Sequence, residues 1–111
     1  MNIIKGLCVD KLLYCVKKEI RYNGEEGHYI DSVSISIFEH KKDAIKFINK
    51  DIIVSKNQIS KDYNVNKDVL NVVIVQDMDL FTIESQAIDD IYEYSIRKMR
   101  VNRNSFSIIA S

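Results

Sequence analysis

The chain has 111 residues, and its 16 basic and 16 acidic side chains give a formal net charge of zero at pH 7. This length is typical of one domain, and residues 1–111 are expected to form a single one. The longest apolar runs are far shorter than the roughly 20 residues that span a bilayer, and Asp10 and Lys11 interrupt the first apolar segment, as a signal peptide would not allow. We therefore expect a cytoplasmic protein with no membrane partner.

Two strands joined by a tight turn are predicted at about 11–22 and 28–38. Asn23 and Gly24 between them form the strongest short hairpin signal. With these two residues at the tip, Leu12 lies opposite Ile35 and Tyr14 opposite Val33, and opposed residues share a face. This register predicts one buried apolar face, made of Leu12, Tyr14, Val16, Val33, Ile35 and Ile37.

The other face of the second strand carries Ser32, Ser34 and Ser36. Small hydroxyl side chains permit close approach by another layer, but exposed serine is also common. Two interpretations stay open: the serines face solvent, or a covering layer packs on them, including a second copy of the chain in a homodimer.

A short amphipathic helix is predicted at about 40–49, where Ala44, Phe47 and Ile48 recur at helical spacing. The following segment, about 54–68, is rich in Asn, Lys and Ser and is predicted to be a surface loop.

Residues 69–76 are nearly continuously apolar and β-branched, which is typical of a central strand buried on both faces. A second amphipathic helix is predicted at about 85–101, with Ile88, Ile91, Ile96 and Met99 facing inward. A short last strand is predicted in the sequence SFSIIA. The fold class is therefore α+β: an antiparallel sheet built on the hairpin and the central strand, with two amphipathic helices.

Acidic residues dominate positions 68–96, which contain seven carboxylates and no Lys or Arg. We expect an acidic side of the molecule that binds a partner protein through complementary charge. A solvated helix start also explains several of these residues. The predicted partner-binding residues are Asp77, Asp79, Glu84, Asp89, Asp90 and Glu93.

A basic segment, RKMRVNR, follows at residues 97–103. It supports an alternative function, a nucleic-acid-associated regulator that binds phosphates through Arg97, Lys98, Arg100 and Arg103. Such proteins usually carry a larger excess of basic charge, and a helix end with a solvated face explains the segment more simply.

No catalytic or cofactor motif is found in the sequence. Cys8, Cys15, His28 and His40 lack the paired spacing of a zinc site, and the three glycines form no phosphate-binding loop. The two cysteines are expected to be reduced, and whether they meet the histidines in space stays open. We therefore expect a non-enzymatic protein with no metal and no cofactor.

The hairpin followed by IFEHKKDAIKFI resembles a recurrent type of small phage and mobile-element protein, over about residues 11–50. In that type a two-stranded unit ends in an aromatic residue and runs into a helix with an inward alanine and aromatic, here Ala44 and Phe47. Some proteins of this kind inhibit bacterial defence systems, and these include the anti-CRISPR proteins. The resemblance thus implies an inhibitor that occupies a surface on a larger protein or nucleoprotein complex, with no catalytic residue.

Overall fold

The computed structural model describes residues 11–102 and 107–110. These form one α+β domain, as predicted, but the helical part is one long helix and two single-turn 3-10 helices instead of two amphipathic helices. In chain order the elements are β1 (Lys11–Gly24), β2 (Gly27–Phe38), α1 (Lys41–Tyr63), η2 (Lys67–Val69), β3 (Asn71–Val75), η3 (Gln76–Met78), β4 (Leu80–Glu84), β5 (Asp90–Asn102) and β6 (Ser107–Ala110).

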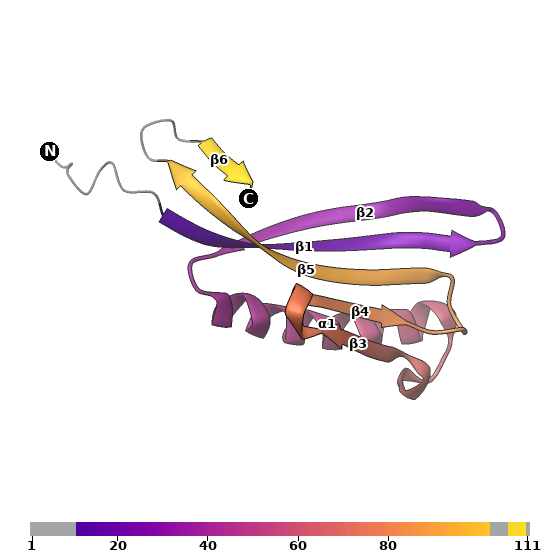
Figure 1. The fold of residues 1–111 in the computed structure, drawn as a ribbon. Helices are drawn as coiled ribbons and strands as arrows, with labels where there is room; N and C mark the ends of the chain where they lie inside the picture. The colour runs from indigo at the N-terminus through magenta and orange to yellow at the C-terminus, as the bar shows by residue number, and fades with distance from the viewer. Residues whose placement is uncertain (1–10, 103–106, 111) are drawn as a thin grey trace, which may run out of the picture.

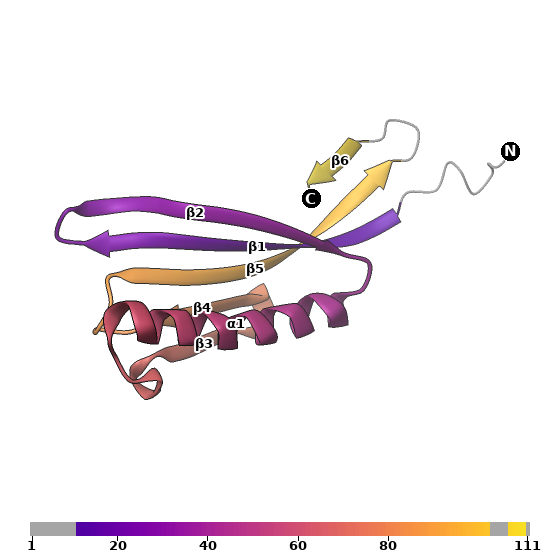
Figure 2. The same cartoon turned by 180° about the vertical axis from the view of Figure 1, so that it is seen from behind.

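The strands form one antiparallel sheet in the order β2-β1-β5-β4-β3, and β6 pairs with the end of β5. The predicted last strand is thereby confirmed. Figure 1 views the sheet with α1 behind the strands, and Figure 2 shows the helix in front of β4 and β3. The helix therefore covers one face of the sheet, where it packs on β1, β5 and β4.

The hairpin register differs from the prediction in two ways. The turn lies at Glu25 and Glu26, two residues beyond the predicted tip, and Gly27 closes it with φ 132°, which side chains other than glycine rarely allow. Pairing then runs from Gly24–Gly27 to Arg21–Ile30 and resumes at Ile20–Ser32. Asp31 is thus an extra residue without a partner in β1, a β-bulge.

The bulge reverses the two faces of β2. A shift of one residue moves every later side chain to the other side of the sheet. Tyr14 consequently lies opposite Phe38, and Cys15 lies opposite Ile37. The predicted buried face was wrong for β2, where Val33, Ile35 and Ile37 are 49%, 55% and 45% exposed. In β1 it was wrong for Leu12, which is 50% exposed.

The three serines lie on the helix side of the sheet, yet α1 does not cover them. β2 is the outermost strand on the side away from β3 and β4 (Figure 2), and it contacts the helix at its end, where Phe38 packs on Phe47. Ser32 and Ser34 are exposed and Ser36 is partly buried. Within the described part of the chain no layer covers Ser32 and Ser34, and cover by a second copy of the chain stays a prediction.

Helix α1 begins near the predicted start but runs to Tyr63, so about two thirds of the predicted loop is helical. Its buried residues continue at intervals of three and four, with a serine in one place where an apolar residue is usual: Ala44, Ile48, Ile52, Ser55 and Ile59. The helix ends at Asn64, which adopts the left-handed conformation (φ 53°) typical of a helix C-terminus.

The predicted central strand is an edge strand. Among the described strands β3 pairs only with β4, and it lies at the end of the strand order. Its four apolar residues, Val72, Val73, Ile74 and Val75, are 37–51% exposed. A continuous apolar run predicts burial on both faces, but the single α-helix among the described residues leaves this strand largely uncovered.

The predicted second helix is strand β5. Its sequence alternates strictly, with Tyr92, Tyr94 and Ile96 on the helix side and Glu93, Ser95 and Arg97 on the other. Aromatic and β-branched residues favour a strand, and this alternation outweighs the apolar positions that had suggested a helix.

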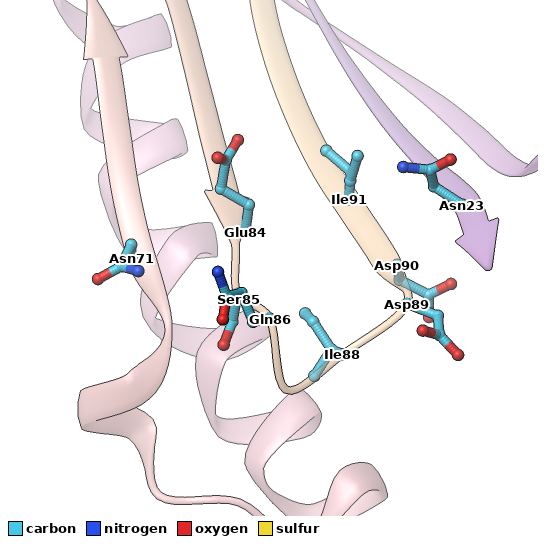
Figure 3. A pocket seen from close by; sticks show the side chains of 9 residues that line it. All are labelled: Asn23, Asn71, Glu84, Ser85, Gln86, Ile88, Asp89, Asp90 and Ile91. Carbon is cyan, nitrogen blue, oxygen red and sulfur yellow. The ribbon is translucent and has the colours of Figure 1, made fainter.

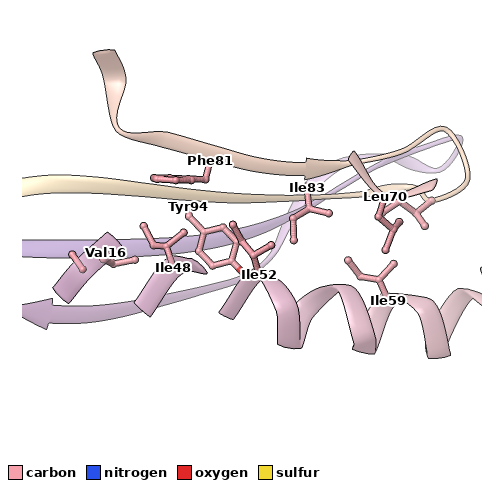
Figure 4. Close-up of a cluster of buried hydrophobic side chains, with 10 residues drawn as sticks. Val16, Ile48, Ile52, Ile59, Leu70, Phe81, Ile83 and Tyr94 are labelled. Carbon is pink, nitrogen blue, oxygen red and sulfur yellow. The ribbon is translucent and has the colours of Figure 1, made fainter. Parts of the chain in front are cut away.

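The core lies between α1 and the helix side of β1, β5 and β4 (Figure 4). Its largest fully buried side chain is Tyr94, and Ile48, Ile59, Ile83 and Val16 are also fully buried. Phe38 and Phe47 pack together at its border, with ring centroids 5.3 Å apart. The core therefore uses only one face of the sheet.

Candidate functional site

The second face of the sheet has no covering layer among the described residues. We call it the open face; it is the side seen in Figure 1. Rows of side chains cross β2, β1 and β5, because opposed residues share a face. The rows are Ile37–Cys15–Arg97, Ile35–Lys17–Ser95 and Val33–Glu19–Glu93, and Leu13 and Met99 extend them.

A hollow of about 210 Å³ lies on the open face, between β2 and β5. It is lined by Cys15, Lys17, Ile35, Ser95, Arg97 and Met99. Burial raises the pKa of the Cys15 thiol, although Arg97 and Lys17 act in the opposite direction. The thiol is therefore protonated at neutral pH and serves as an apolar part of the lining. The hollow combines apolar side chains with two cationic ones.

Beside the hollow, an ion-pair network holds β1 to β5. Glu19 is only 8% exposed although it belongs to the open face, and it binds Lys17 at 3.2 Å and Arg21 at 3.0 Å. Arg21 also binds Glu93 at 2.8 Å. Hydrogen bonds from Arg21 and Lys17 lower the pKa of Glu19. The network fixes the cationic side chains next to the apolar rows.

A second polar cluster lies on the helix side, between α1 and the sheet. The Tyr94 hydroxyl donates to Asp51 at 2.7 Å, and the hydroxyls of Tyr94 and Ser55 are 2.8 Å apart. The Lys18 ammonium lies 2.8 Å from Asp51 and donates to Ser55 at 3.0 Å. Desolvation opposes ionisation of Asp51, but bonds from Lys18 and Tyr94 outweigh it and lower the pKa.

Serine, lysine and tyrosine together are a set that can carry nucleophilic catalysis. Here Ser55 is 3% exposed, and Asp51, Lys18 and Tyr94 surround its hydroxyl oxygen. A substrate has no access to that oxygen, and the Lys18 ammonium is bound to a carboxylate. The cluster therefore links the helix to the sheet.

The six predicted acidic residues lie in three places. Glu84, Asp89 and Asp90 line one pocket of about 350 Å³ at the ends of β4 and β5, with Asn23 and Asn71 (Figure 3). Asp90 also accepts a hydrogen bond from the Tyr63 hydroxyl at 2.9 Å. We call Glu84, Asp89 and Asp90 the acidic corner.

The remaining acidic residues are separate from this corner. Asp77 and Asp79 lie at the other end of β4, where Asp79 binds Lys41 at 3.0 Å. Glu93 belongs to the ion-pair network of the open face. Only three of the six thus come together, and a role in partner binding stays a prediction.

The basic segment divides between the two faces of the sheet because it is a strand. Arg97 lies on the open face, whereas Lys98 and Arg100 lie on the helix side, opposite Tyr14 and Leu12. Arg103 falls outside the described residues. No single phosphate-binding surface is formed by the three described residues.

Residues 11–102 and 107–110 contain no group of three His, Cys, Asp or Glu side chains that could hold a metal ion. His28 pairs with Asn23 in the hairpin and His40 precedes α1, while Cys8 lies outside the described residues. Within the same ranges no helix has the length and apolar character needed to cross a membrane.

The open face was missed in the sequence because the predicted register buried it. Its signal was present: the alternation of Val33, Ile35 and Ile37 is clear, and only the bulge at Asp31 decides on which side of the sheet they lie.

Comparison of the chain with models of protein families, with curated proteins and with solved structures gives no match.

Proposed function

We propose that the protein is a non-enzymatic binding module that occupies a surface on a larger protein through its open face. The observation that carries this proposal is the exposure of Val33, Ile35 and Ile37 in one row along β2, each about half exposed. Contiguous exposed apolar side chains are costly in water and are typical of interaction surfaces.

The chemistry of the hollow defines the partner. Ile35, Met99 and Cys15 accept an apolar side chain, while Lys17 and Arg97 favour a carboxylate next to it. No carboxylate among residues 11–102 forms an ion pair with Arg97 at 4 Å or less. The partner therefore presents an apolar anchor residue flanked by Asp or Glu, and complementary charge sets its orientation.

The class of partner rests on the resemblance of residues 11–50 to small phage and mobile-element proteins. On that basis the larger protein belongs to a bacterial defence complex, and the module acts as an inhibitor by covering part of its surface. Binding takes place in the cytoplasm of the bacterial host.

The test is a pulldown from a bacterial lysate with the full chain and three matched variants. Ile35→Lys places a charge at the centre of the apolar row, and because the side chain is 55% exposed we expect the variant to fold. Val54→Lys makes the same kind of change at a residue of α1 that is 62% exposed. The third variant, Glu84→Lys with Asp89→Lys, alters the acidic corner.

We expect a protein that the wild type and Val54→Lys retain and that Ile35→Lys loses, with affinity weakened by at least about tenfold. Circular dichroism checks that each variant is folded. Retention by Ile35→Lys would contradict the open-face proposal. Loss of the partner protein in the acidic-corner variant alone would show that the binding surface includes Glu84 and Asp89 instead.

A further inference from the structure

The two edges of the sheet differ in how they are protected against pairing with another strand. Native edge strands usually carry a charge, a proline or a bulge that prevents such pairing. β2 has both a bulge and a charge, at Asp31. β3, with the sequence NVVIV, has no charge and no proline, and the strand order gives it no neighbour beyond β4 among the described strands.

The apolar surface of β3 continues onto helix α1. Ile74 lines a hollow of about 410 Å³ together with Ile45, Asn49 and Phe81. Ile53 follows one turn after Asn49 on the same flank of the helix and is 62% exposed. An added strand at this edge would thus find hydrogen-bonding groups from β3 and apolar side chains from α1.

We propose that β3 pairs antiparallel with β3 of a second copy of this chain, across a two-fold axis at Val73. A two-fold contact brings the same patch of both copies together, so the patch must fit itself. With Val73 opposite its own copy, Val72 lies opposite Ile74 and Asn71 opposite Val75. All five residues then pair, and no charge faces another within the ladder.

Charges next to the strand are compatible with the same arrangement. Lys67 and Asp68 precede β3, and Asp77 follows it. In the antiparallel pair the start of one β3 lies beside the end of the other, so Asp77 of each copy lies near both Lys67 and Asp68 of its partner, and the attraction and the repulsion offset each other. Opposed residues share a face, so both helices lie on one side of the joined sheet.

The test uses the residue on the two-fold axis, because it faces its own copy. Val73→Lys places two ammonium groups opposite each other, and Val73→Glu places two carboxylates there. Val73 is 44% exposed, so each variant is expected to fold as the wild type does. Val54→Lys serves as the control for added charge elsewhere.

Sedimentation velocity over a concentration series measures the association. We expect dimers of the wild type and of Val54→Lys, and a dissociation constant raised by about tenfold or more in each Val73 variant alone. An equimolar mixture of the two variants should form dimers again, because lysine then faces glutamate. This recovery excludes misfolding as the cause of dissociation.

Three results would overturn the proposal. They are a wild type that stays monomeric at all concentrations, a dimer that Val73→Lys leaves intact, and two folded Val73 variants that fail to associate when mixed. A dimer broken by Ile35→Lys but not by Val73→Lys would also overturn it, by placing the contact on the open face. The experiment needs no partner protein, so it stands apart from the pulldown.

Discussion

At the scale of single residues, Tyr94 connects the core to its polar cluster. Its ring is completely buried among apolar side chains, and its hydroxyl reaches Asp51 and Ser55. A buried hydroxyl without a partner would destabilise the fold, and Asp51 and Ser55 on α1 supply the hydrogen-bond partners of Tyr94. Lys18 on β1 then balances the carboxylate. One aromatic side chain thereby sets the position of the helix against the sheet.

Asp51→Asn tests this cluster through its pH dependence. The lowered pKa of Asp51 means that its ionised form stabilises the folded state above the ordinary carboxyl pKa of about 3.9, and that this contribution disappears as the pH falls through the folded-state value. We expect the free energy of unfolding of the variant to be about 2 kcal/mol lower than that of the wild type at pH 7. Urea unfolding should show the difference from wild type shrinking below about pH 4. A difference that stays constant down to pH 2 would contradict the role of the ionised carboxylate.

Cys15 allows a second test at this scale. Because burial raises the pKa of its thiol, alkylation at pH 7 should be slower than that of a free cysteine in solution. The measurement uses a Cys8→Ser variant, so that only one thiol reacts, and follows mass with time in iodoacetamide. Reaction as fast as that of free cysteine would show that the hollow on the open face does not enclose the sulfur.

At the scale of elements, the sequence predicted the hairpin, the start of α1 and the last strand, because each has a local signal that tertiary structure did not override. The end of α1 was missed because Ser55 occupies a buried position, where its hydroxyl has partners that only the fold supplies. Strand β5 was missed because Ile88, Ile91 and Ile96 approximate helical spacing. Nothing local reveals that Asp31 has no pairing partner.

The second half of α1 provides a test of the corrected helix. Ile59 is completely buried, and Ile59→Ala should lower the free energy of unfolding by about 2–5 kcal/mol. Val54→Ala, in the same half of the helix but 62% exposed, should change it by less than about 0.5 kcal/mol. Thermal or urea unfolding of both variants gives the comparison. Equally small effects of both substitutions would contradict the burial of Ile59 and support the predicted surface loop for residues 54–63.

At the scale of the whole molecule, the protein is long for its size. Its extents are 58 × 27 × 24 Å and its radius of gyration is 17.4 Å, whereas a compact domain of this length has about 13 Å. The length follows from the long strands β1, β2 and β5, which extend well past the helix (Figure 1). Among the described residues, much of the sheet therefore lacks a second layer, and both candidate interaction surfaces are consequences of this shape.

Small-angle scattering tests the shape. The Val73→Lys variant is the right sample because self-association would otherwise enlarge the particle. We expect a radius of gyration near 17 Å or slightly above, together with a distance distribution skewed toward long distances. A value near 13 Å would mean that the hairpin folds back onto the rest of the molecule and that the open face is covered.

The bulge at Asp31 also has a genetic consequence. Loss of the Asp31 codon would remove only the residue without a partner, so Arg21 would still lie opposite Ile30 and Ile20 opposite Ser32, and Val33, Ile35 and Ile37 would keep their side of the sheet. The same deletion would remove the bulge and the one acidic side chain of β2 together. A lineage that loses this codon would therefore keep its exposed apolar row but leave β2 as open to pairing with a foreign strand as β3 is, so aggregation and not partner binding should respond to length variation at this position.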